Sequence, residues 1–436
     1  MKELFYVINL PQGLHARPAA KLAEIASEAK SLVTVEKGEL TANAKSVLQI
    51  LKINVKQHEK VTIRVEGEDE DEVAEKIDKL LQSHPSEKLD GKSIFRIAFF
   101  GSKNYDKLYF SQLSHEKGDH TYNSHIHFFE PRLTEETADI AKGYDAVCIF
   151  VNDDCSKKVI ETLHEFNIHL ILLRCAGFNN VDLKAAKEFN MTVLRVPAYS
   201  PYAVAEHAMA ILQAANRRLH KAYNRVRDND FELSGLVGLD LHNKVAGVLG
   251  TGKIGQCFAR ICKGYGMTVL GWDAYPNQSL VDEGLLTYAS LDEVLAKADL
   301  ISLHAPLIMG EGGTYHLINK ERVDMMKDDV MLINTARGAL IDNEALLYGL
   351  SNKKFHAVAL DVYEGEDDNV YTNRSSDVIE NDITARLQFY PQVLLTSHQA
   401  FFTREALQAI ATVTMENALN YITGKDYGNA LVEYKE

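Results

Sequence analysis

The chain is short of the features that mark secreted, metal-binding or membrane-spanning proteins. Its 436 residues include five cysteines, at positions 148, 155, 175, 257 and 262, and no two of them form a CxxC pair. This spacing gives neither a disulfide framework nor a zinc site, so we expect no bound metal and a reduced, cytoplasmic chain with its thiols in the core. No apolar run approaches the length of a membrane span, and the first residues do not resemble a signal peptide.

The chain also has fewer positively charged than negatively charged residues. Lys and Arg number 47 against 61 Asp and Glu, which gives a formal net charge of −14. This balance argues against nucleic acid or an anionic membrane as a partner. The hydrophobic share of 46% is that of a globular protein, and the length allows two to four domains. An anionic substrate must therefore be held by local groups rather than by the overall field.

A glycine-rich turn follows the apolar run at 245–249. Gly250, Gly252 and Gly255 form G-x-G-x-x-G between a predicted strand and a predicted helix, which is the context of dinucleotide binding. Unpaired amides at the start of that helix can meet phosphates. A second predicted strand, 267–272, ends on Asp273, where a carboxylate can accept the ribose hydroxyls and repel a 2′-phosphate. The glycines alone could be a plain turn, but together with Asp273 they predict NAD rather than NADP.

Strand and helix patterns alternate over the rest of the chain, which is typical of parallel α/β sheets. The predicted strands are 94–100, 146–151, 168–173, 192–196, 300–304, 330–334, 357–360 and 393–396. A long helix is predicted over 202–227, opened by Ser200 as cap and Pro201 at its first position, and a closing helix over 403–423. We predict two Rossmann-like doubly wound domains: an NAD-binding domain at 199–399, and a discontinuous substrate domain at 94–198 and 400–436.

Three polar segments directly follow predicted strands and carry Arg337, Glu366 and His398. Ligands of open α/β sheets bind outside the carboxyl ends of the strands. An Arg can bind the carboxylate or carbonyl of a 2-keto acid, a His can donate a proton, and a carboxylate can hold the second imidazole nitrogen. Each residue alone could be an ordinary surface group, and spacing leaves Glu364 open as the partner of the His. Their joint placement favours reduction of a 2-keto acid.

Several segments resemble the D-isomer-specific 2-hydroxyacid dehydrogenases, and most closely their bacterial fermentative D-lactate dehydrogenases. The matching segments are 173–182, 196–201, 203–208, 250–255, 361–364 and 397–401, together with the loop that carries Arg337. The resemblance implies a flavodoxin-like substrate domain, with Arg337 as the substrate-binding residue, Glu366 as the partner of the His, and His398 as the acid/base. It also implies pyruvate as the substrate and a homo-oligomer. A larger 2-keto acid, or a protein that only senses NADH, stays open.

The same resemblance implies further binding residues. The amides of Ala176 and Gly177 are expected to hold the substrate carboxylate, and Tyr199 to line the pocket. Besides the three glycines and Asp273, the expected cofactor-binding residues are Lys253, Ile254, Pro306, Thr335 and Asp361.

Residues 1–84 alternate on a smaller scale, with predicted strands at 4–10 and 61–66 and predicted helices at 19–30 and 73–81. The acidic run 68–72 is expected to be the solvated first turn of the last helix. The segment 13–19, G-L-H-A-R-P-A, places His15 at the start of a helix beside Arg17. Such an imidazole can accept a phosphoryl group, although an isolated His there is more often a plain surface residue.

This part of the chain resembles HPr, the histidine phosphocarrier of the sugar phosphotransferase system. The resemblance implies an open-faced α/β sandwich over 1–88, a linker at 89–93, phosphorylation of His15, and Arg17 as the phosphate partner. Ser46 falls where many such carriers have a regulatory phosphoserine, and it is also a plausible helix N-cap. The implied partners are the Enzyme I and other proteins of that system. Because phosphoenolpyruvate yields pyruvate when it donates its phosphoryl group, the carrier could report the supply of substrate.

Overall fold

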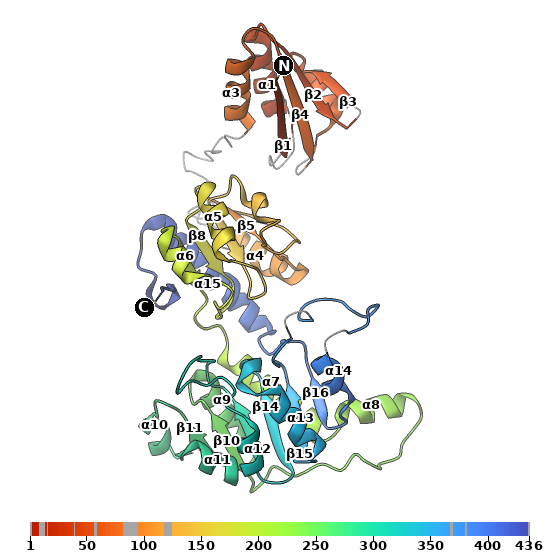
Figure 1. Ribbon diagram of the computed structural model, residues 1–436, viewed down its shortest axis with the longest axis vertical. Helices are drawn as coiled ribbons and strands as arrows, with labels where there is room; N and C mark the ends of the chain where they lie inside the picture. Colours follow the sequence, from red (N-terminus) through yellow and green to blue (C-terminus); the bar gives the residue numbers. More distant parts are fainter. Residues whose placement is uncertain are drawn as a thin grey trace. The chain divides into compact units, whose positions relative to one another are not determined.

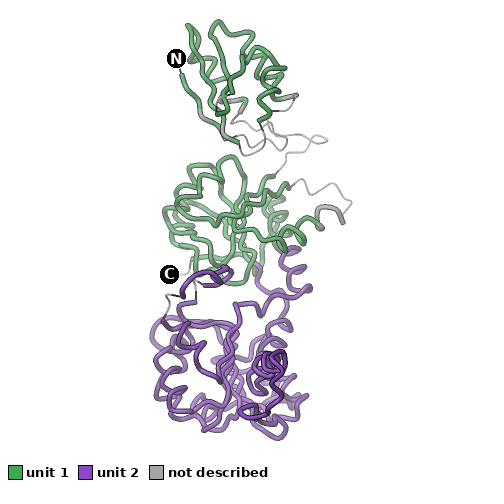
Figure 2. The backbone as a smooth tube through the Cα atoms, turned by 90° about the vertical axis from the view of Figure 1, so that its right-hand side faces the viewer, with its two compact units in different colours: residues 1–195, 414–436 green, residues 196–413 purple. Residues whose placement is uncertain are grey.

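The computed structural model describes residues 2–7, 14, 16–38, 40–55, 59–81, 95–116, 124–366, 369–379 and 382–434. Its strands form three sheets, and the chain divides into two compact units, residues 1–195 with 414–436 and residues 196–413 (Figure 2). The predicted domain boundaries stay a prediction, and the predicted linker at 89–93 lies outside the described residues. Within those residues, no helix is both long and apolar enough to cross a membrane.

The first sheet is antiparallel, in the order β1-β4-β2-β3 (Figure 1). Its strands are β1 (Lys2–Val7), β2 (Leu32–Lys37), β3 (Leu40–Asn43) and β4 (Lys60–Glu66), and its helices are α1 (Ala16–Glu28), α2 (Val47–Ile53) and α3 (Glu70–Leu81). In β4 the side chains of Val61, Ile63 and Val65 are buried while the residues between them are not, which confirms the predicted alternation. One face of the sheet therefore shares a core with the three helices.

Three acids of the run 68–72, Glu70, Asp71 and Glu72, lie in the first turn of α3 as expected, and Asp69 directly precedes that turn. The carboxylate of Asp69 accepts hydrogen bonds from the backbone amides of Lys30 and Ser31, both at 2.8 Å, and from the Ser31 hydroxyl. These bonds, the Ser31 hydroxyl first, lower the pKa of Asp69 to about 2. The expected acidic first turn is therefore confirmed, and Asp69 has a further role as the acceptor that joins the start of α3 to a turn nearly forty residues away.

The second sheet is parallel, in the order β6-β5-β7-β8-β9. Its strands are β5 (Phe95–Phe99), β6 (Ser124–Phe128), β7 (Ala146–Ile149), β8 (Leu170–Leu173) and β9 (Thr192–Arg195), with helices α4 (Asn104–Glu116), α5 (Lys157–Glu165) and α6 (Leu183–Glu188) and the 3-10 turn η1 (Ala138–Ala141). Ala98 packs into the core that contains α5 and α6, whereas Phe99 points the other way and contacts Phe110 of α4. Both faces are covered, as the apolar strands predict.

The third sheet is also parallel, in the order β12-β11-β10-β13-β14-β15-β16 (Figure 1). Its strands are β10 (Val245–Leu249), β11 (Thr268–Trp272), β12 (Thr287–Tyr288), β13 (Leu300–Leu303), β14 (Val330–Asn334), β15 (Phe355–Leu360) and β16 (Val393–Leu395). Helices α7 (Pro201–Asn216) and α9 (Lys253–Gly264) share a core with one face, and α11 (Leu291–Lys297), α12 (Lys320–Met325) and α13 (Asn343–Ser351) with the other. The predicted doubly wound sheet is confirmed.

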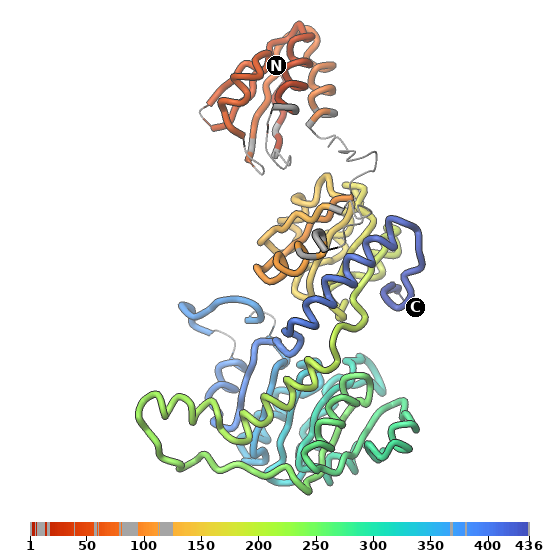
Figure 3. The backbone as a smooth tube through the Cα atoms, turned by 180° about the vertical axis from the view of Figure 1, so that it is seen from behind, coloured from red at the N-terminus to blue at the C-terminus, as the bar shows by residue number. Residues whose placement is uncertain are grey.

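The remaining elements are α8 (Leu219–Arg227), α10 (Gln278–Asp282), α14 (Asp382–Phe389), α15 (Arg404–Thr423), η2 (Gly338–Leu340) and η3 (Gly428–Ala430). The cap of α7 is as predicted, because the Ser200 hydroxyl accepts from the amide of Ala203 and Pro201 is its first residue. A single helix over 202–227 was wrong: the chain breaks at Arg218, whose φ is +51° and whose guanidinium donates to the carbonyl of His356 at 2.7 Å. α8 then leaves the body of its unit (Figures 1 and 3).

Candidate active site

The glycine loop between β10 and α9 has the geometry of a phosphate-binding turn. Gly250 has φ +94°, and a Cβ there would lie 2.5 Å from the amide nitrogen of Ala305. A Cβ on Gly255 would lie 2.0 Å from the carbonyl oxygen of Gly250, so the helix can pack this closely only with glycine. At Gly252 a Cβ would meet nothing within 4 Å. The loop is therefore tight on its protein side and open where a pyrophosphate would approach.

The first turn of α9 and the end of β11 complete this region. Lys253 and Ile254 begin α9, and Gly252 caps the helix without a side-chain bond, so its first amides stay available to an anion. The Asp273 carboxylate accepts from the Thr251 amide at 2.6 Å and from the Thr251 hydroxyl at 3.0 Å. These bonds fix the acid beside the glycine loop, where it can meet a ribose.

Two further predicted cofactor residues lie on loops after β13 and β14. The carbonyl of Pro306 accepts from the Thr314 hydroxyl, and Pro306 itself is exposed. Thr335 is 8% exposed, and its hydroxyl is buried without a hydrogen-bond partner among the described residues. A buried hydroxyl without a partner is a group that a bound ligand can satisfy.

Arg337 follows β14 in a loop that is held by Asn334. The Asn334 side chain accepts from the amide of Ala336 at 3.0 Å and donates to the carbonyl of Arg337 at 2.9 Å. The Arg337 guanidinium donates to the Ala336 carbonyl at 2.7 Å, and no carboxylate in the described part of the chain pairs with it. The loop is therefore rigid while the cation keeps free donors for an anionic ligand.

The loop after β16 carries His398, and its imidazole pairs with Glu366. His398 Nδ1 lies 2.9 Å from Glu366 Oε1; the acid side chain is 11% exposed and the imidazole 27%. The competing acid, Glu364, instead pairs with His316 Nε2 at 3.0 Å. Gly365 lies between the two acids with φ +85°, and this turn sends their side chains to different histidines. The pairing leaves Nε2 of His398 free for a proton transfer.

A network that the sequence did not reveal holds the His398 loop. Asp361 is fully buried, and its carboxylate accepts from the Thr396 hydroxyl at 2.6 Å, the Gln399 amide at 2.9 Å and the Ala400 amide at 2.8 Å. His207 Nε2, on α7, lies 3.3 Å from the same carboxylate. The expected role of Asp361 as a cofactor-binding residue stays a prediction, because these donors give it a structural role of its own. No local pattern identifies His207; only the fold brings it to Asp361.

His398 also has an unusual backbone. Its φ is +54°, its amide donates to the carbonyl of Asp361 at 2.9 Å, and its own carbonyl accepts from the Tyr371 hydroxyl at 2.9 Å. A left-handed non-glycine residue persists when its surroundings hold it, and such residues cluster at functional sites. The loop therefore presents the imidazole in one fixed orientation.

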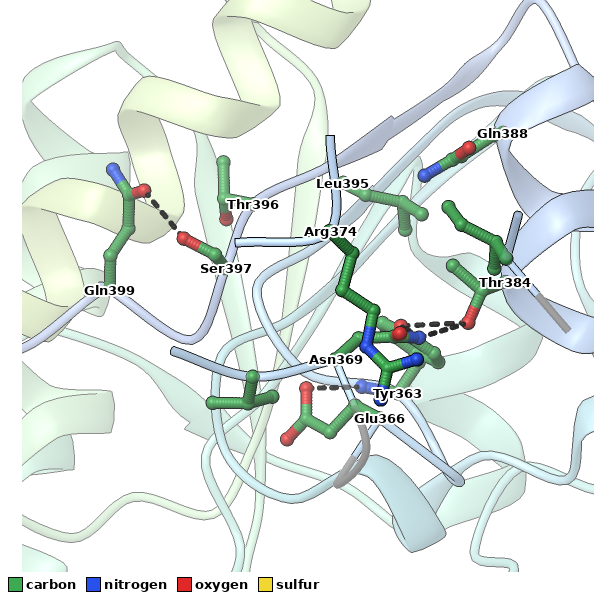
Figure 4. A pocket seen from close by; sticks show the side chains of 12 residues that line it. Tyr363, Glu366, Asn369, Arg374, Thr384, Gln388, Leu395, Thr396, Ser397 and Gln399 are labelled. Carbon is green, nitrogen blue, oxygen red and sulfur yellow. Dashed lines mark hydrogen bonds between the residues drawn. The ribbon is translucent and has the colours of Figure 1, made fainter. Parts of the chain in front are cut away.

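A cavity of about 370 Å³ lies next to this pair (Figure 4). Its lining residues include Glu366, Tyr363, Asn369 and Arg374, and Figure 4 shows them on one side with Thr396, Ser397 and Gln399 on the other. Asn369 donates to the hydroxyl oxygens of Tyr363 and Thr384, which fixes this wall. Neither Arg337 nor His398 lines the cavity, so it lies behind Glu366 and not at the acid/base nitrogen.

The predicted carboxylate-binding residues belong to the other unit. Ala176 and Gly177 follow β8 and are partly exposed, and the carbonyl of Ala176 accepts from Arg195 Nη1 at 3.0 Å. Tyr199, by contrast, lies in the same unit as His398, and its ring is 6.3 Å from that of Phe401. Ala176 and Gly177 therefore belong to one unit and Tyr199 to the other, and the structure describes their surroundings within those units.

The predicted phosphocarrier residues are only partly described. His15 lies outside the described residues, as does the side chain of Arg17, which falls within α1. Ser46 caps α2: its hydroxyl accepts from the amide of Gln49, as the N-cap prediction requires.

Comparisons with known proteins agree with this geometry. Residues 209–400 match the family model described as "D-isomer specific 2-hydroxyacid dehydrogenase, NAD binding domain", and residues 3–83 match that described as "PTS HPr component phosphorylation site". The D-lactate dehydrogenase of Escherichia coli is 46% identical over 337 residues, which are 77% of this chain and all of that protein. A 2-hydroxyacid dehydrogenase homolog of Haemophilus influenzae is 45% identical over 76% of this chain and 97% of its own length.

Solved structures give the same result. The apo-structure of the Escherichia coli D-lactate dehydrogenase superposes with a TM-score of 0.69 at 45% identity, covering 78% of this chain and 100% of that one. The pyruvate reductase of Chlamydomonas reinhardtii gives 0.71 at 42% identity, covering 77% and 98%. A D-lactate dehydrogenase of Lactobacillus jensenii, solved with NAD+, gives 0.65 at 28% identity, covering 78% and 100%. The chain therefore belongs to the D-isomer-specific 2-hydroxyacid dehydrogenases, with an NAD-binding domain, and carries an HPr domain within residues 3–83.

Proposed function

We propose that the chain reduces pyruvate to D-lactate with NADH. The observation that carries this proposal is the His398–Glu366 pair at 2.9 Å, on the carboxyl side of a parallel sheet. Strand β14 of the same sheet presents Arg337, which pairs with no carboxylate among the residues that the structure describes. A proton donor and an anion-binding cation are the groups that reduction of a 2-keto acid requires. The named activities of the E. coli and C. reinhardtii proteins support pyruvate as the substrate.

The proposed mechanism uses the His398–Glu366 pair and Arg337. NADH, held by the glycine loop and Asp273, would supply the hydride that reduces C2 of the keto acid. Protonated His398 donates the proton on Nε2 to the carbonyl oxygen, and Glu366 accepts a hydrogen bond from Nδ1–H, so that the imidazole is held in place and its positive charge is balanced before transfer. Arg337 binds the carboxylate and carbonyl oxygens with its fork of donors.

The remaining assignments follow the family. The amides of Ala176 and Gly177 bind the substrate carboxylate, and Tyr199 lines the pocket. The cofactor is held by the glycine loop and by the residues described above after β11, β13, β14 and β15, namely Lys253, Ile254, Asp273, Pro306, Thr335 and Asp361. The open space at Gly252 supports this placement, as does the Thr335 hydroxyl, for which the described part of the chain offers no hydrogen-bond partner.

A panel of 2-keto acids tests the proposal. The full chain is mixed with NADH and pyruvate, 2-ketoisocaproate or phenylpyruvate, and NADH oxidation is followed by absorbance. We expect the highest kcat/KM with pyruvate and a product that only a D-specific assay recognises. A higher value with a larger acid would make the protein a different 2-hydroxyacid dehydrogenase. Absence of turnover with every acid would favour a protein that binds NADH as a signal.

We propose further that His15 accepts a phosphoryl group, with Arg17 as its partner, from the Enzyme I of the phosphotransferase system. The match of residues 3–83 to the HPr model supports this assignment. Incubation with Enzyme I and phosphoenolpyruvate should add one phosphoryl group that is lost in acid and missing from a His15→Ala variant. Equal lactate formation by the phosphorylated protein and the variant would exclude regulation through this site. Ser46 remains a proposed second phosphorylation site.

The chain is also proposed to form a homo-oligomer through α8 and the segment after it. α8 has no buried residue, and apolar side chains along this arm are half to four-fifths exposed: Leu219, Tyr223, Val226, Phe231, Leu233 and Val237. Large apolar side chains that are exposed repeatedly along one segment are typical of an interface. Light scattering should give a multiple of 48.8 kDa, and a variant with both Phe231→Asp and Leu233→Asp should give the monomer mass.

The free, buried cysteines support a cytoplasmic location.

A further inference from the structure

The loop after β8 is anchored through its carbonyl groups. The Ala176 carbonyl accepts from Arg195 Nη1 at 3.0 Å, and the Gly177 carbonyl accepts from the Cys175 thiol at 3.3 Å. The C=O and N–H of a trans peptide point to opposite sides. The amide of Gly177 therefore faces away from Arg195. Within the described part of the chain, the amides of Ala176 and Gly177 donate to no acceptor.

Arg195 itself carries a charge that is not balanced by any carboxylate in the described ranges. It ends β9, its guanidinium carbon lies 5.1 Å from the centre of the Phe178 ring, and its Nε is buried without a hydrogen-bond partner among the described residues. None of the described carboxylates pairs with it. Its backbone is fixed as well, because its carbonyl accepts from the side chain of the buried Asn417 at 2.9 Å. Keeping a cation partly buried without a counterion lowers the stability of the fold. The cost is offset when the positive charge attracts a bound anion.

We infer that Arg195 is a positioning residue for the substrate carboxylate, acting through the peptide between Ala176 and Gly177. The inference rests on the proposed function. By holding the Ala176 carbonyl, the guanidinium fixes the outward direction of the Gly177 amide. It also polarises the peptide, because a hydrogen bond to the carbonyl strengthens the N–H on the other side. The unpaired positive charge behind the peptide adds attraction for an anion in front of it. Arg195 therefore strengthens anion binding without touching the anion.

Steady-state kinetics separate this role from a structural one. In an R195M variant, KM for pyruvate should rise about tenfold or more, while kcat at saturating pyruvate stays within about threefold and KM for NADH does not change. R195K keeps the charge and a donor, so it should recover most of the lost affinity. R195Q keeps a donor without the charge, so its KM should fall between those of R195K and R195M, and it replaces R195M if that variant does not fold.

The same sheet offers a matched control. Arg96 lies in β5, its side chain is 20% exposed, and its guanidinium pairs with Asp145 at 3.6 Å. An R96M variant removes an arginine from the same sheet and should leave KM for pyruvate unchanged. If R96M raises KM as much as R195M does, the effect is one of general stability and the inference is wrong.

Binding of oxamate, a pyruvate isostere that is not reduced, gives a second readout. Calorimetric titration in the presence of NADH should show oxamate bound about tenfold more weakly by R195M than by the wild type. If the wild type reduces pyruvate and R195M keeps both its KM and its oxamate affinity, the inference fails while the proposed function stands. If the wild type neither reduces a 2-keto acid nor binds oxamate, both fail. A fall in kcat alone also overturns the inference.

Discussion

The Asp361→Asn substitution tests what holds His398 in place. The buried carboxylate accepts from the Thr396 hydroxyl and the Gln399 amide on one oxygen and from the Ala400 amide on the other. An asparagine has a single acceptor oxygen. If that oxygen serves Thr396 and Gln399, the side-chain NH2 group points at the Ala400 N–H and leaves two buried donors facing each other.

The magnitude follows from these contacts. A buried donor left without a partner costs about 1–3 kcal/mol, and a neutral acceptor makes hydrogen bonds roughly half as strong as a charged one. We therefore expect the variant to lose about 2–4 kcal/mol of unfolding free energy, which lowers Tm by about 4–16 °C for a domain of this size. Because the same bonds hold the loop with its left-handed His398, kcat/KM for pyruvate should fall on the order of 100-fold.

Thermal unfolding by circular dichroism and steady-state kinetics measure the two effects. Asp342→Asn is the matched control, since the Asp342 side chain caps α13 with one bond to the Glu344 amide, and asparagine caps a helix equally well. A D361N variant within about 1 °C of the wild-type Tm and within twofold of its kcat/KM would show that the Asp361 hydrogen bonds do not hold the His398 loop, because a buried unpaired donor lowers stability measurably.

The pH dependence of this stability has a definite sign. Burial on its own raises the pKa of Asp361, but the bonds from His207, Thr396 and the two loop amides outweigh it and hold the pKa below the usual value of 3.8. A depressed pKa in the folded state means that the stabilisation is fully present above the unfolded value and is lost as pH falls through the folded one. The difference in Tm between wild type and D361N should therefore be constant near neutral pH and shrink below about pH 4.

Four other substitutions have outcomes that follow from the same structure. His398→Asn should lower kcat for pyruvate by about 10²–10⁴-fold with NADH binding intact, as measured by fluorescence titration, and Glu366→Gln should do so less severely because an amide can still accept from Nδ1–H. Asp273→Ser should raise kcat/KM with NADPH relative to NADH, since the repulsion of a 2′-phosphate is removed; an unchanged ratio would contradict the assignment. Asp69→Asn should lower the unfolding midpoint of the HPr domain at pH 7, and the difference should vanish as pH falls through about 2, where the Ser31-bound carboxylate of the wild type is protonated.

Much of the fold was predictable because periodicity and burial agree along the chain. Most central strands of the parallel sheets are apolar runs, and the positions of β13, β14 and β16 follow from them directly, whereas the edge strands β6 and β12 carry polar residues and give no such signal. The break between α7 and α8 was not predictable, because residues 216–219 contain neither glycine nor proline. The left-handed turn at Arg218 is stabilised by its bond to the His356 carbonyl, 138 residues away. Local sequence carries no signal for such a contact.

The candidate site also has a part that the sequence predicts and a part that only the fold decides. Motif spacing placed Arg337, Glu366 and His398 after neighbouring strands, but it could not choose between Glu364 and Glu366, which are two residues apart. The choice is made by the positive φ of Gly365 and by the position of His316 across the fold. Both are tertiary facts, so spacing alone leaves the pairing open.

Asp361 and Arg195 both hold the backbone of a loop by hydrogen bonds, and they do so with opposite charges. The sign of the charge decides whether the N–H groups or the C=O groups of the loop are bound. The Asp361 carboxylate accepts hydrogen bonds from amides, so it holds its loop by the N–H groups, and the loop presents the side chain of His398. The Arg195 guanidinium donates to a carbonyl, so it holds the loop after β8 by a C=O group, and that loop presents N–H groups. A loop that must offer a proton-transferring side chain is therefore best held by an anion, and a loop that must bind an anion with its amides is best held by a cation.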